Sequence, residues 1–118
     1  MEEEILVLDA DDTQCNELCT ILKDLDCRAT PTSTLQDFKT YMDSGEYRVV
    51  ILDLDSLSFD KNFFIKLKKI KPTIQIMGLS SRPFHPELED VMSRHIYACL
   101  SKPVDEEELA FWIKSLTH

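Results

Sequence analysis

The chain has 118 residues, of which 43% are hydrophobic and 30% charged, so residues 1–118 suit one compact domain with a single core. The formal net charge of −9 disfavours binding of nucleic acid by this domain, which would need a basic face, and it disfavours anionic membrane surfaces. The acidic start Met-Glu-Glu-Glu is unlike a signal peptide and no apolar run has membrane-spanning length, so we expect a cytoplasmic protein.

Five short apolar runs alternate with longer helical patterns along the chain. The predicted strands are residues 4–9, 27–30, 49–53, 74–80 and 97–101. Residues 49–52 are apolar at every position, which is typical of a strand covered on both faces. Five repeats of strand and helix indicate an α/β fold with a parallel sheet, because parallel neighbours need long crossovers. Right-handed crossovers then place helices on both faces of the sheet.

The segments between these strands have the spacing of amphipathic helices. The predicted helices are residues 13–25, 35–43, 59–70, 86–94 and 109–116. Asp12 is predicted to cap the first helix, and Ser33 with Gln36 resembles a capping box before the second. Asp105 with Glu108 forms another such start before the last helix.

Polar side chains follow the ends of four of the predicted strands. In open parallel sheets the functional crevice lies beyond the carboxyl ends of the strands, so these side chains are expected on one rim. In chain order they are Asp9 with Asp11, Asp53 with Asp55, Ser80, and Lys102. The order of residue types, more than any single residue, makes the pattern specific.

The rim residues have the chemistry of a phosphoryl-accepting site. Two carboxylates about 5 Å apart repel by roughly 3 kcal/mol at an effective dielectric constant near 20. A hard divalent cation such as Mg²⁺ removes that repulsion and leaves positions open for water or phosphate oxygens. A carboxylate can act as a nucleophile toward a phosphoryl group, and a lysine and a hydroxyl nearby would bind the phosphoryl oxygens.

The sequence resembles the receiver domain of bacterial response regulators over essentially the whole chain, and the rim residues carry this resemblance. The matching segments, in chain order, are ILVLDADD, VVILDLDSLSFD, IMGLSS and CLSKPVDEEEL. The resemblance implies a flavodoxin-like fold with a five-stranded parallel sheet in the order 2-1-3-4-5. It also implies a phosphoprotein that works in two-component or phosphorelay signal transduction.

The resemblance further implies roles for individual residues. Asp53 would be the phosphoacceptor, Ser80 the hydroxyl and Lys102 the lysine that sense the phosphoryl group. Mg²⁺ would be held mainly by Asp9, with Asp11, Asp53 and Asp55 as the remaining expected ligands, the last through its backbone carbonyl.

The same resemblance implies the partners and the limits of the chemistry. The phosphoryl group would come from a sensor histidine kinase, a phosphotransfer protein or a small phosphodonor, and the output would act on a downstream protein. A homodimer through the face of the fourth helix, fifth strand and fifth helix is a further expectation. The domain would be no enzyme beyond its own phosphorylation and dephosphorylation.

Two positions depart from the family pattern. Ala10 stands where the family usually has the second of two adjacent acids, so Mg²⁺ is expected to bind weakly unless Asp11 or Asp12 compensates. Cys99 stands where an aromatic residue usually changes rotamer, and a thiol is too small to relay that motion in the same way. Both departures favour an alternative function, a phosphorylation-deficient pseudo-receiver that acts only as a protein-docking module.

An enzyme class offers a second alternative. The segment DADDT also fits Asp-x-Asp-x-Thr, the nucleophile motif of haloacid-dehalogenase-like phosphatases. In that interpretation Asp9 attacks the substrate and Asp11 is the acid/base. Those enzymes are usually longer, and their late acids follow a strand, whereas Asp105 and Glu106 resemble the start of a helix.

The cysteines and the last helix complete the sequence-based expectations. The four cysteines include no Cys-x-x-Cys pair, so reduced and largely buried thiols are expected. Leu109, Ile113 and Leu116 form a core stripe at helical spacing. Phe111 and Trp112 are adjacent, so at least one of them is expected near the surface, where a partner or a second copy would contact it.

Overall fold

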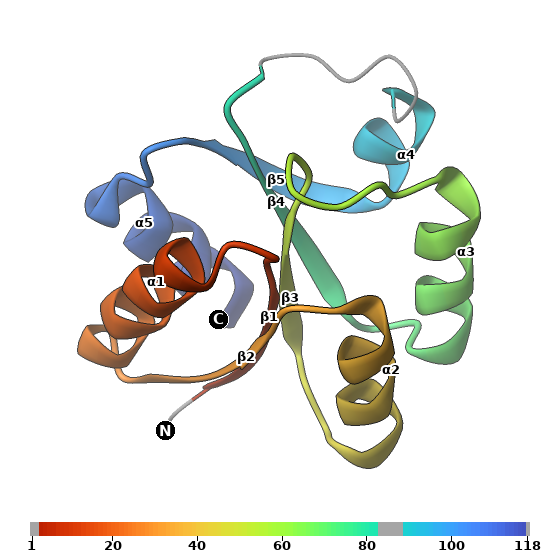
Figure 1. Ribbon diagram of the computed structural model, residues 1–118, viewed down its shortest axis with the longest axis horizontal. Coiled ribbons are helices and arrows are strands. Elements are labelled where there is room, and N and C mark those ends of the chain that lie inside the picture. The colour runs from red at the N-terminus through yellow and green to blue at the C-terminus, as the bar shows by residue number, and fades with distance from the viewer. Residues whose placement is uncertain (1–2, 83–88, 118) are drawn as a thin grey trace.

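A computed structural model describes residues 3–82 and 89–117, which form a central parallel sheet with helices on both faces (Figure 1). The strands are β1 (Glu3–Leu8), β2 (Cys27–Thr32), β3 (Val49–Asp53), β4 (Gln75–Ser80) and β5 (Ile96–Ser101). Their order in the sheet is β2-β1-β3-β4-β5, with every neighbouring pair parallel. The strand order and the fold class implied by the sequence are therefore confirmed.

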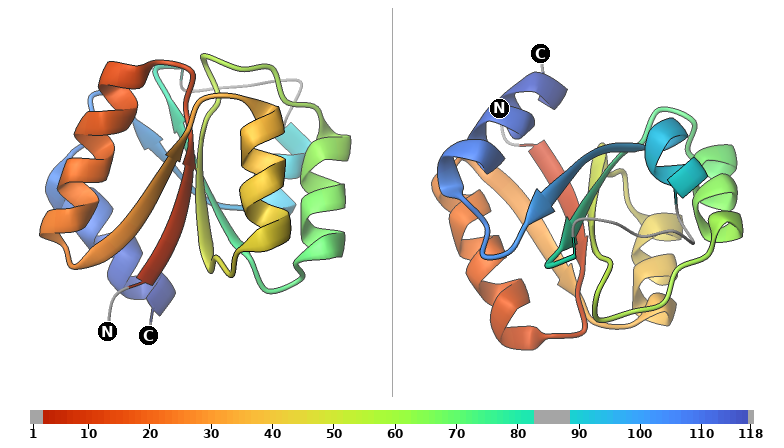
Figure 2. Two further views of the ribbon diagram at one scale, coloured as in Figure 1. Left: turned by 60° about the horizontal axis from the view of Figure 1, so that its bottom comes forward. Right: turned by 90° about the horizontal axis from the view of Figure 1, so that it is seen from above.

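The helices divide between the two faces of this sheet. They are α1 (Asp12–Asp24), α2 (Leu35–Ser44), α3 (Lys61–Ile70), α4 (Glu89–Arg94) and α5 (Glu106–Thr117). Figure 2 shows α1 and α5 together on one face and α2 and α3 on the other. No helix within residues 3–82 and 89–117 is long and apolar enough to cross a membrane.

Alternation along the inner strands fills a separate hydrophobic layer on each face. In β1, Leu6 and Leu8 belong to the layer under α2 and α3, whereas Ile5 and Val7 belong to the layer under α1 and α5. All four side chains are fully buried, because successive residues of a strand point to opposite faces and both faces are covered. The sheet is therefore held rigidly from both sides, which fixes the positions of the strand ends.

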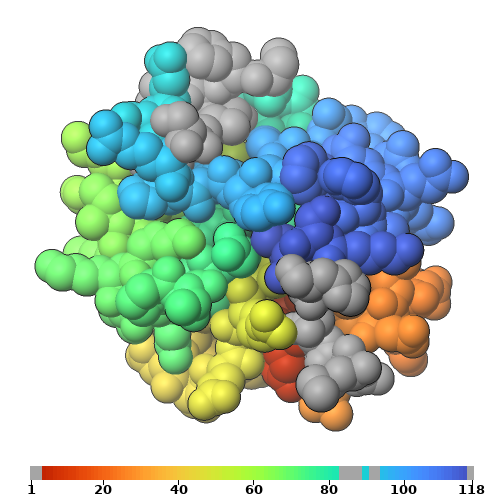
Figure 3. Space-filling view, turned by 180° about the vertical axis from the view of Figure 1, so that it is seen from behind, coloured from red at the N-terminus to blue at the C-terminus, as the bar shows by residue number. Residues whose placement is uncertain are grey.

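The outer strand β5 differs from the inner strands, because only every second one of its side chains is buried. An irregularity in its pairing with β4 lets Ile96 join the layer under α2 and α3, while Leu100 joins the layer under α1 and α5. Its exposed side chains include Tyr97, whose ring packs edge-on against Trp112 of α5, and Cys99, which pairs with Gly78 of β4 and has its Sγ near that residue. Figure 3 shows the surface on which β5 and α5 lie side by side.

The prediction of buried thiols is correct for Cys15 and Cys27 but wrong for Cys99. The four cysteines, all within the described residues, form no disulfide.

Three helix starts differ by one or two residues from the sequence-based prediction. The N-cap of α1 is Asp11 instead of Asp12, that of α2 is Thr34 instead of Ser33, and α3 begins after Asp60. Each observed cap has an extended backbone, and its side chain accepts a hydrogen bond from the N–H three residues further on. Asp12 and Ser33 stand next to the observed caps and carry similar side chains, so the sequence alone does not show which residue of each pair is the cap.

The two remaining helix predictions have different outcomes. Part of the segment predicted as 86–94 lies outside the described residues, and the described part contains α4. The cap predicted at Asp105 is confirmed, because its carboxylate accepts the N–H groups of Glu107 at 2.8 Å and Glu108 at 3.4 Å. The expectation for the last helix also holds, since Phe111 is 61% exposed while Trp112 is only partly buried.

Candidate functional site

The carboxyl ends of four strands bring the predicted polar residues together. Asp9 directly follows β1, Asp53 ends β3 and Ser80 ends β4. All three are buried at the edge of the sheet, with Asp9 0%, Asp53 1% and Ser80 4% exposed. Lys102 directly follows β5, and its side chain reaches back over this edge. The fold therefore assembles the rim that the order of residue types predicted.

Lys102 joins two carboxylates of this rim. Its Nζ lies 2.6 Å from Oδ1 of Asp53 and 3.0 Å from Oδ2 of Asp55. Burial opposes the charge on the ammonium, but the two carboxylates outweigh it and raise the pKa of Lys102. Burial also opposes ionisation of Asp53, yet the hydrogen bonds from Lys102 and from the backbone N–H of Asp55 hold the pKa of Asp53 below its usual value. The phosphoacceptor candidate is thus an ionised carboxylate at neutral pH.

Asp9 is held in a different way. Its Oδ1 accepts the backbone N–H of Asp11 at 2.9 Å, and its Oδ2 accepts a hydrogen bond from Nε2 of Gln14. Nε2 of Gln14 also lies 3.3 Å from Oδ2 of Asp53. Burial raises the pKa of Asp9, and the neighbouring Asp53 adds to that effect. The amide of Gln14 therefore bridges the two buried carboxylates at the point where they would otherwise repel.

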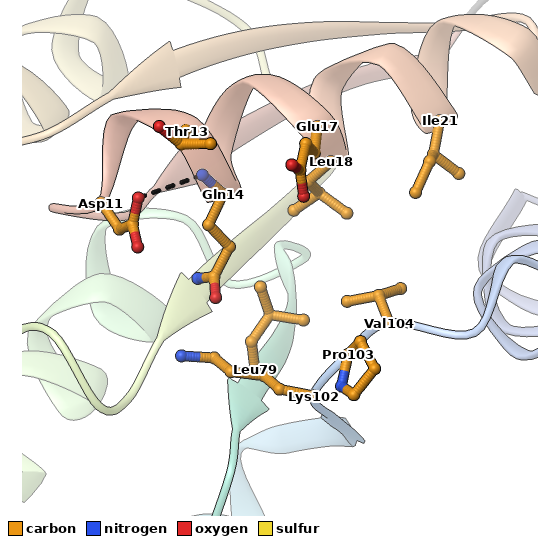
Figure 4. Close-up of a pocket in the computed structure, with 10 residues that line it drawn as sticks. All are labelled: Asp11, Thr13, Gln14, Glu17, Leu18, Ile21, Leu79, Lys102, Pro103 and Val104. Atoms are coloured by element: carbon orange, nitrogen blue, oxygen red, sulfur yellow. Dashed lines mark hydrogen bonds between the residues drawn. The ribbon is translucent and has the colours of Figure 1, made fainter.

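Sequence reasoning missed the part that Gln14 plays. Asp11 caps α1, so Gln14 occupies the third position of the helix, where a glutamine is normally interpreted as the partner in a capping box. Its amide instead points toward the strand ends, into a cavity of about 330 Å³ that Lys102 borders from the other side (Figure 4). The spacing Asp11-x-x-Gln14 was the available signal, but only the fold shows which way the amide turns.

The carboxylate of Asp55 points away from Asp9 and toward the end of β4. Its Oδ1 accepts the hydroxyl of Ser80 at 2.9 Å, and its Oδ2 accepts the backbone N–H and the hydroxyl of Ser81 at 2.7 and 2.9 Å. Burial alone would raise the pKa of Asp55, but these hydrogen bonds, with the one from Lys102, hold it well below the usual range. Nε of Arg82 lies 4.0 Å from Oδ1 of the same carboxylate.

The donor set partly suits a divalent cation. Asp9 and Asp53 present the buried carboxylate oxygens that Mg²⁺ prefers, and one or two carboxylates with water suffice for this ion. Of the other expected ligands, Asp11 has a carboxylate that caps α1. Asp55 is expected to contribute its backbone carbonyl, and its carboxylate faces the end of β4. Ala10 supplies no side-chain ligand. Within the described part of the chain, no three His, Cys, Asp or Glu side chains are arranged to hold a metal ion.

Comparison with known proteins identifies the fold. No family model matches the chain, and no curated protein matches it. Solved structures match over nearly the whole length. The signal receiver domain of an HD domain-containing protein from Pseudomonas fluorescens Pf-5 has a TM-score of 0.86 at 21% identity, covering 99% of this chain and 95% of that chain. A CheY-like receiver domain protein from Methanospirillum hungatei JF-1 has a TM-score of 0.86 at 16% identity, with the same coverage.

A third match has the same character. The signal receiver domain of a DNA-binding response regulator from Colwellia psychrerythraea 34H has a TM-score of 0.84 at 19% identity, covering 98% of each chain. The chain therefore has the flavodoxin-like fold of response regulator receiver domains. Its structural neighbours are receiver domains of two-component systems, so the resemblance predicted from the sequence is confirmed for the fold.

Proposed function

We propose that this chain is a phosphoacceptor module of two-component signalling and that Asp53 receives the phosphoryl group. One observation carries the proposal: Asp53 is a buried carboxylate, and Nζ of Lys102 lies 2.6 Å from its Oδ1 at the edge formed by the carboxyl ends of the strands. Burying a charge is costly unless it is paired and hydrogen-bonded, and Lys102 supplies that pairing for Asp53. Asp53 also lies at the edge where ligands bind open parallel sheets. Ser80 adds a hydroxyl at the neighbouring strand end.

The proposed reaction is a phosphoryl transfer to a carboxylate. An oxygen of Asp53 attacks the phosphorus of a donor such as acetyl phosphate and forms a new P–O bond. The P–O bond to the acetyl group breaks, and acetate leaves with the electron pair. Lys102 and Ser80 supply charge-assisted hydrogen bonds to the phosphoryl oxygens as negative charge gathers there. The domain catalyses no other reaction in this proposal.

Mg²⁺ is part of the proposed function. Asp9 and Asp53 would hold the ion, and it would neutralise their charge together with that of the incoming phosphoryl group. The amide of Gln14 now donates to both carboxylates, so it would have to turn away before the ion could contact them.

Replacing Gln14 by alanine is therefore expected to tighten Mg²⁺ binding by about 3- to 10-fold, because the ion no longer competes with the amide. Isothermal titration calorimetry of native protein and of Gln14→Ala measures the two affinities. Gln36→Ala, an exposed glutamine of α2, is the matched control and should leave the affinity unchanged. Equal affinities in the native protein and in Gln14→Ala would show that the amide does not compete with the ion.

The decisive test of the phosphoacceptor is intact mass after incubation with acetyl phosphate, with and without Mg²⁺. A Mg²⁺-dependent phosphoryl adduct is expected on the native chain and is expected to disappear in Asp53→Asn. This substitution removes the attacking oxygen but keeps the shape of the side chain. An adduct that persists in Asp53→Asn and is lost in Asp9→Asn would instead support the phosphatase-like alternative.

The partners in this proposal are a sensor histidine kinase or phosphotransfer protein and a downstream protein, in the cytoplasm. The face of α4, β5 and α5 is the proposed output and homodimer surface. It carries an aromatic cluster in which the ring of Trp112 lies edge-on to Tyr97 at 5.6 Å and to Phe111 at 5.1 Å. Tyr97 is 43% and Phe111 61% exposed, so both rings are available to a partner.

A second candidate function is the docking module without phosphorylation. The specific observation in its favour is the amide of Gln14, which donates hydrogen bonds to the carboxylates of both Asp9 and Asp53. In that case no adduct forms from acetyl phosphate or from any cognate kinase, and partner binding is indifferent to phosphodonor.

A further inference from the structure

The carboxylate of Asp55 lies in a pocket made almost entirely of hydrogen-bond donors. Four donors contact its two oxygens: the Ser80 hydroxyl, the Ser81 N–H, the Ser81 hydroxyl and the Lys102 ammonium. The donor–acceptor distances range from 2.7 to 3.0 Å, and the donors belong to the carboxyl ends of the neighbouring strands β4 and β5. This is the arrangement by which proteins bind oxyanions, with a backbone N–H, hydroxyls and one cation converging on a negative group.

The pocket borders the phosphoacceptor directly. Lys102 is shared, with its Nζ 2.6 Å from Asp53 and 3.0 Å from Asp55, so the two carboxylates face the same ammonium. A phosphoryl group on Asp53 would carry about two negative charges and three acceptor oxygens into this space. The donors within reach of those oxygens are the ones that now contact Asp55.

We propose that the carboxylate of Asp55 is a resident anion in an oxyanion pocket formed by Ser80, Ser81 and Lys102, and that a phosphoryl group on Asp53 must displace it. The proposal rests on the proposed phosphoacceptor function for its physiological ligand. The pocket itself would accept any tetrahedral oxyanion of suitable size once Asp55 is removed. Asp55 is thus an internal brake on the site.

Displacement is required because the donors are limited in number. The hydroxyl of Ser80 has one proton, which it donates to Asp55, while its oxygen accepts the N–H of Arg82 at 3.0 Å. The N–H of Ser81 has one hydrogen and points at the same carboxylate. A phosphoryl oxygen that takes either donor leaves Asp55 with fewer partners and places two negative groups side by side, which is unfavourable.

The same geometry has a consequence for the resting protein. Because an anion already contacts Ser80, Ser81 and Lys102, these residues are drawn toward the strand ends before any phosphoryl group arrives. Phosphorylation then exchanges one anion for another and does not draw the donors in from elsewhere. The conformational difference between the two forms at this edge of the sheet is expected to be small.

The test uses Asp55→Ala and inorganic phosphate as the probe. Asp55 is on the surface edge of the site, with a side chain 21% exposed, so the variant should fold. Phosphate is titrated into ¹⁵N-labelled protein, and the backbone amide of Ser81 is followed by NMR. Phosphate is expected to bind Asp55→Ala at least about 10-fold more tightly than the native chain and to shift the Ser81 amide, since the resident competitor is gone.

Asp60→Asn is the matched control, because it removes one charge from the same β3–α3 loop while asparagine still caps α3. It should bind phosphate as weakly as the native chain. Equal binding by all three proteins, or binding to Asp55→Ala that leaves the Ser81 amide unmoved, would overturn the proposal.

Phosphate binding involves no covalent step, so it reports on the pocket even when Asp53 takes up no phosphoryl group. Failure of the phosphoacceptor function is seen separately, as the absence of an adduct by intact mass. Where the native chain does form the adduct, Asp55→Ala is expected to form it about 10-fold faster. An adduct that forms on Asp55→Ala no faster than on the native chain would contradict the proposal that Asp55 slows phosphorylation of Asp53.

Discussion

Replacing Lys102 by methionine is expected to lower the free energy of unfolding at neutral pH by about 2–4 kcal/mol, because it leaves a buried carboxylate without its cation. Methionine is similar in length and apolar, so the loss reflects the ammonium more than the packing. The effect falls mainly on Asp53, which is 1% exposed and 2.6 Å from the lost charge. Urea unfolding of the native and variant proteins measures the difference. The variant is also expected to take up no measurable phosphoryl group.

The loss should depend on pH with a definite sign. In the native fold the pKa of Asp53 is lowered, so its pairing stabilises the protein fully above the unfolded-chain value of about 3.9 and less as pH falls through the folded pKa. In Lys102→Met burial prevails, the pKa of Asp53 rises above the unfolded value, and the ionised group opposes folding. The difference between the two proteins is therefore largest near pH 7 and smaller near about pH 4.

A double variant isolates the pair from other effects of losing the lysine. Lys102→Met combined with Asp53→Asn removes both charges, so much of the stability lost in the single variant should return. Asp55 keeps its three hydrogen-bond donors from Ser80 and Ser81 in both the single and the double variant, so its carboxylate still has partners there. A Lys102→Met loss of the same size in the native background and in the Asp53→Asn background would mean that the ion pair does not stabilise the fold.

The sequence predicts the fold well because hydrophobic periodicity reports directly on burial. Residues 49–52 are all apolar and Asp53 follows them, and β3 spans Val49–Asp53 in the structure, as predicted. The order of the strands and the positions of Asp53, Ser80 and Lys102 follow from parallel pairing and the resemblance, and the carboxyl ends do meet at one edge. Strand ends are therefore predictable when the sheet is parallel and covered on both faces.

Side-chain direction is less predictable, because it depends on which donors the tertiary structure brings near. The sequence suggests that Asp11 belongs with Asp9 as a metal ligand, yet the backbone at Asp11 is extended and its carboxylate caps α1. The sequence suggests the backbone carbonyl of Asp55 as a metal ligand, but it does not predict that the carboxylate of Asp55 contacts Ser80 at the end of β4 and Ser81 directly after it. Sequence patterns name the residues of a rim but not the partner that each of them selects.

In the proposed function, Mg²⁺ and the phosphoryl group would each replace a side chain that now holds the site together. Gln14 supplies N–H donors between Asp9 and Asp53, where an ion would otherwise offset their repulsion. Asp55 supplies an anion among Ser80, Ser81 and Lys102, where phosphoryl oxygens would otherwise lie. In this proposal the amide of Gln14 and the carboxylate of Asp55 occupy the positions of the cation and of the phosphoryl group. The proposed activation would then replace these two side-chain contacts by contacts to Mg²⁺ and to the phosphoryl group.

The position of Asp55 depends on the β3–α3 loop, which is packed against a cluster of three phenylalanine rings. Phe59 closes the loop, and its ring centroid lies 5.9 Å from that of Phe64 and 5.0 Å from that of Phe63. Phe63 in turn lies edge-on to Phe64 at 5.3 Å. Phe64 is fully buried at the centre of this group, so it ties the loop to the layer under α2 and α3.

Phe64→Ala is therefore expected to lower the free energy of unfolding by about 3–5 kcal/mol, through lost burial and the cavity that remains. For a domain of this size that corresponds to a drop in Tm of roughly 10–20 °C, measurable by circular dichroism. Ile65→Ala is the control on the same helix, because Ile65 is 46% exposed and its truncation should cost less than about 0.5 kcal/mol. Equal losses at the two positions would contradict the buried aromatic anchor. A Phe64→Ala protein that keeps its native Tm would show that the loop carrying Asp55 is positioned by other contacts.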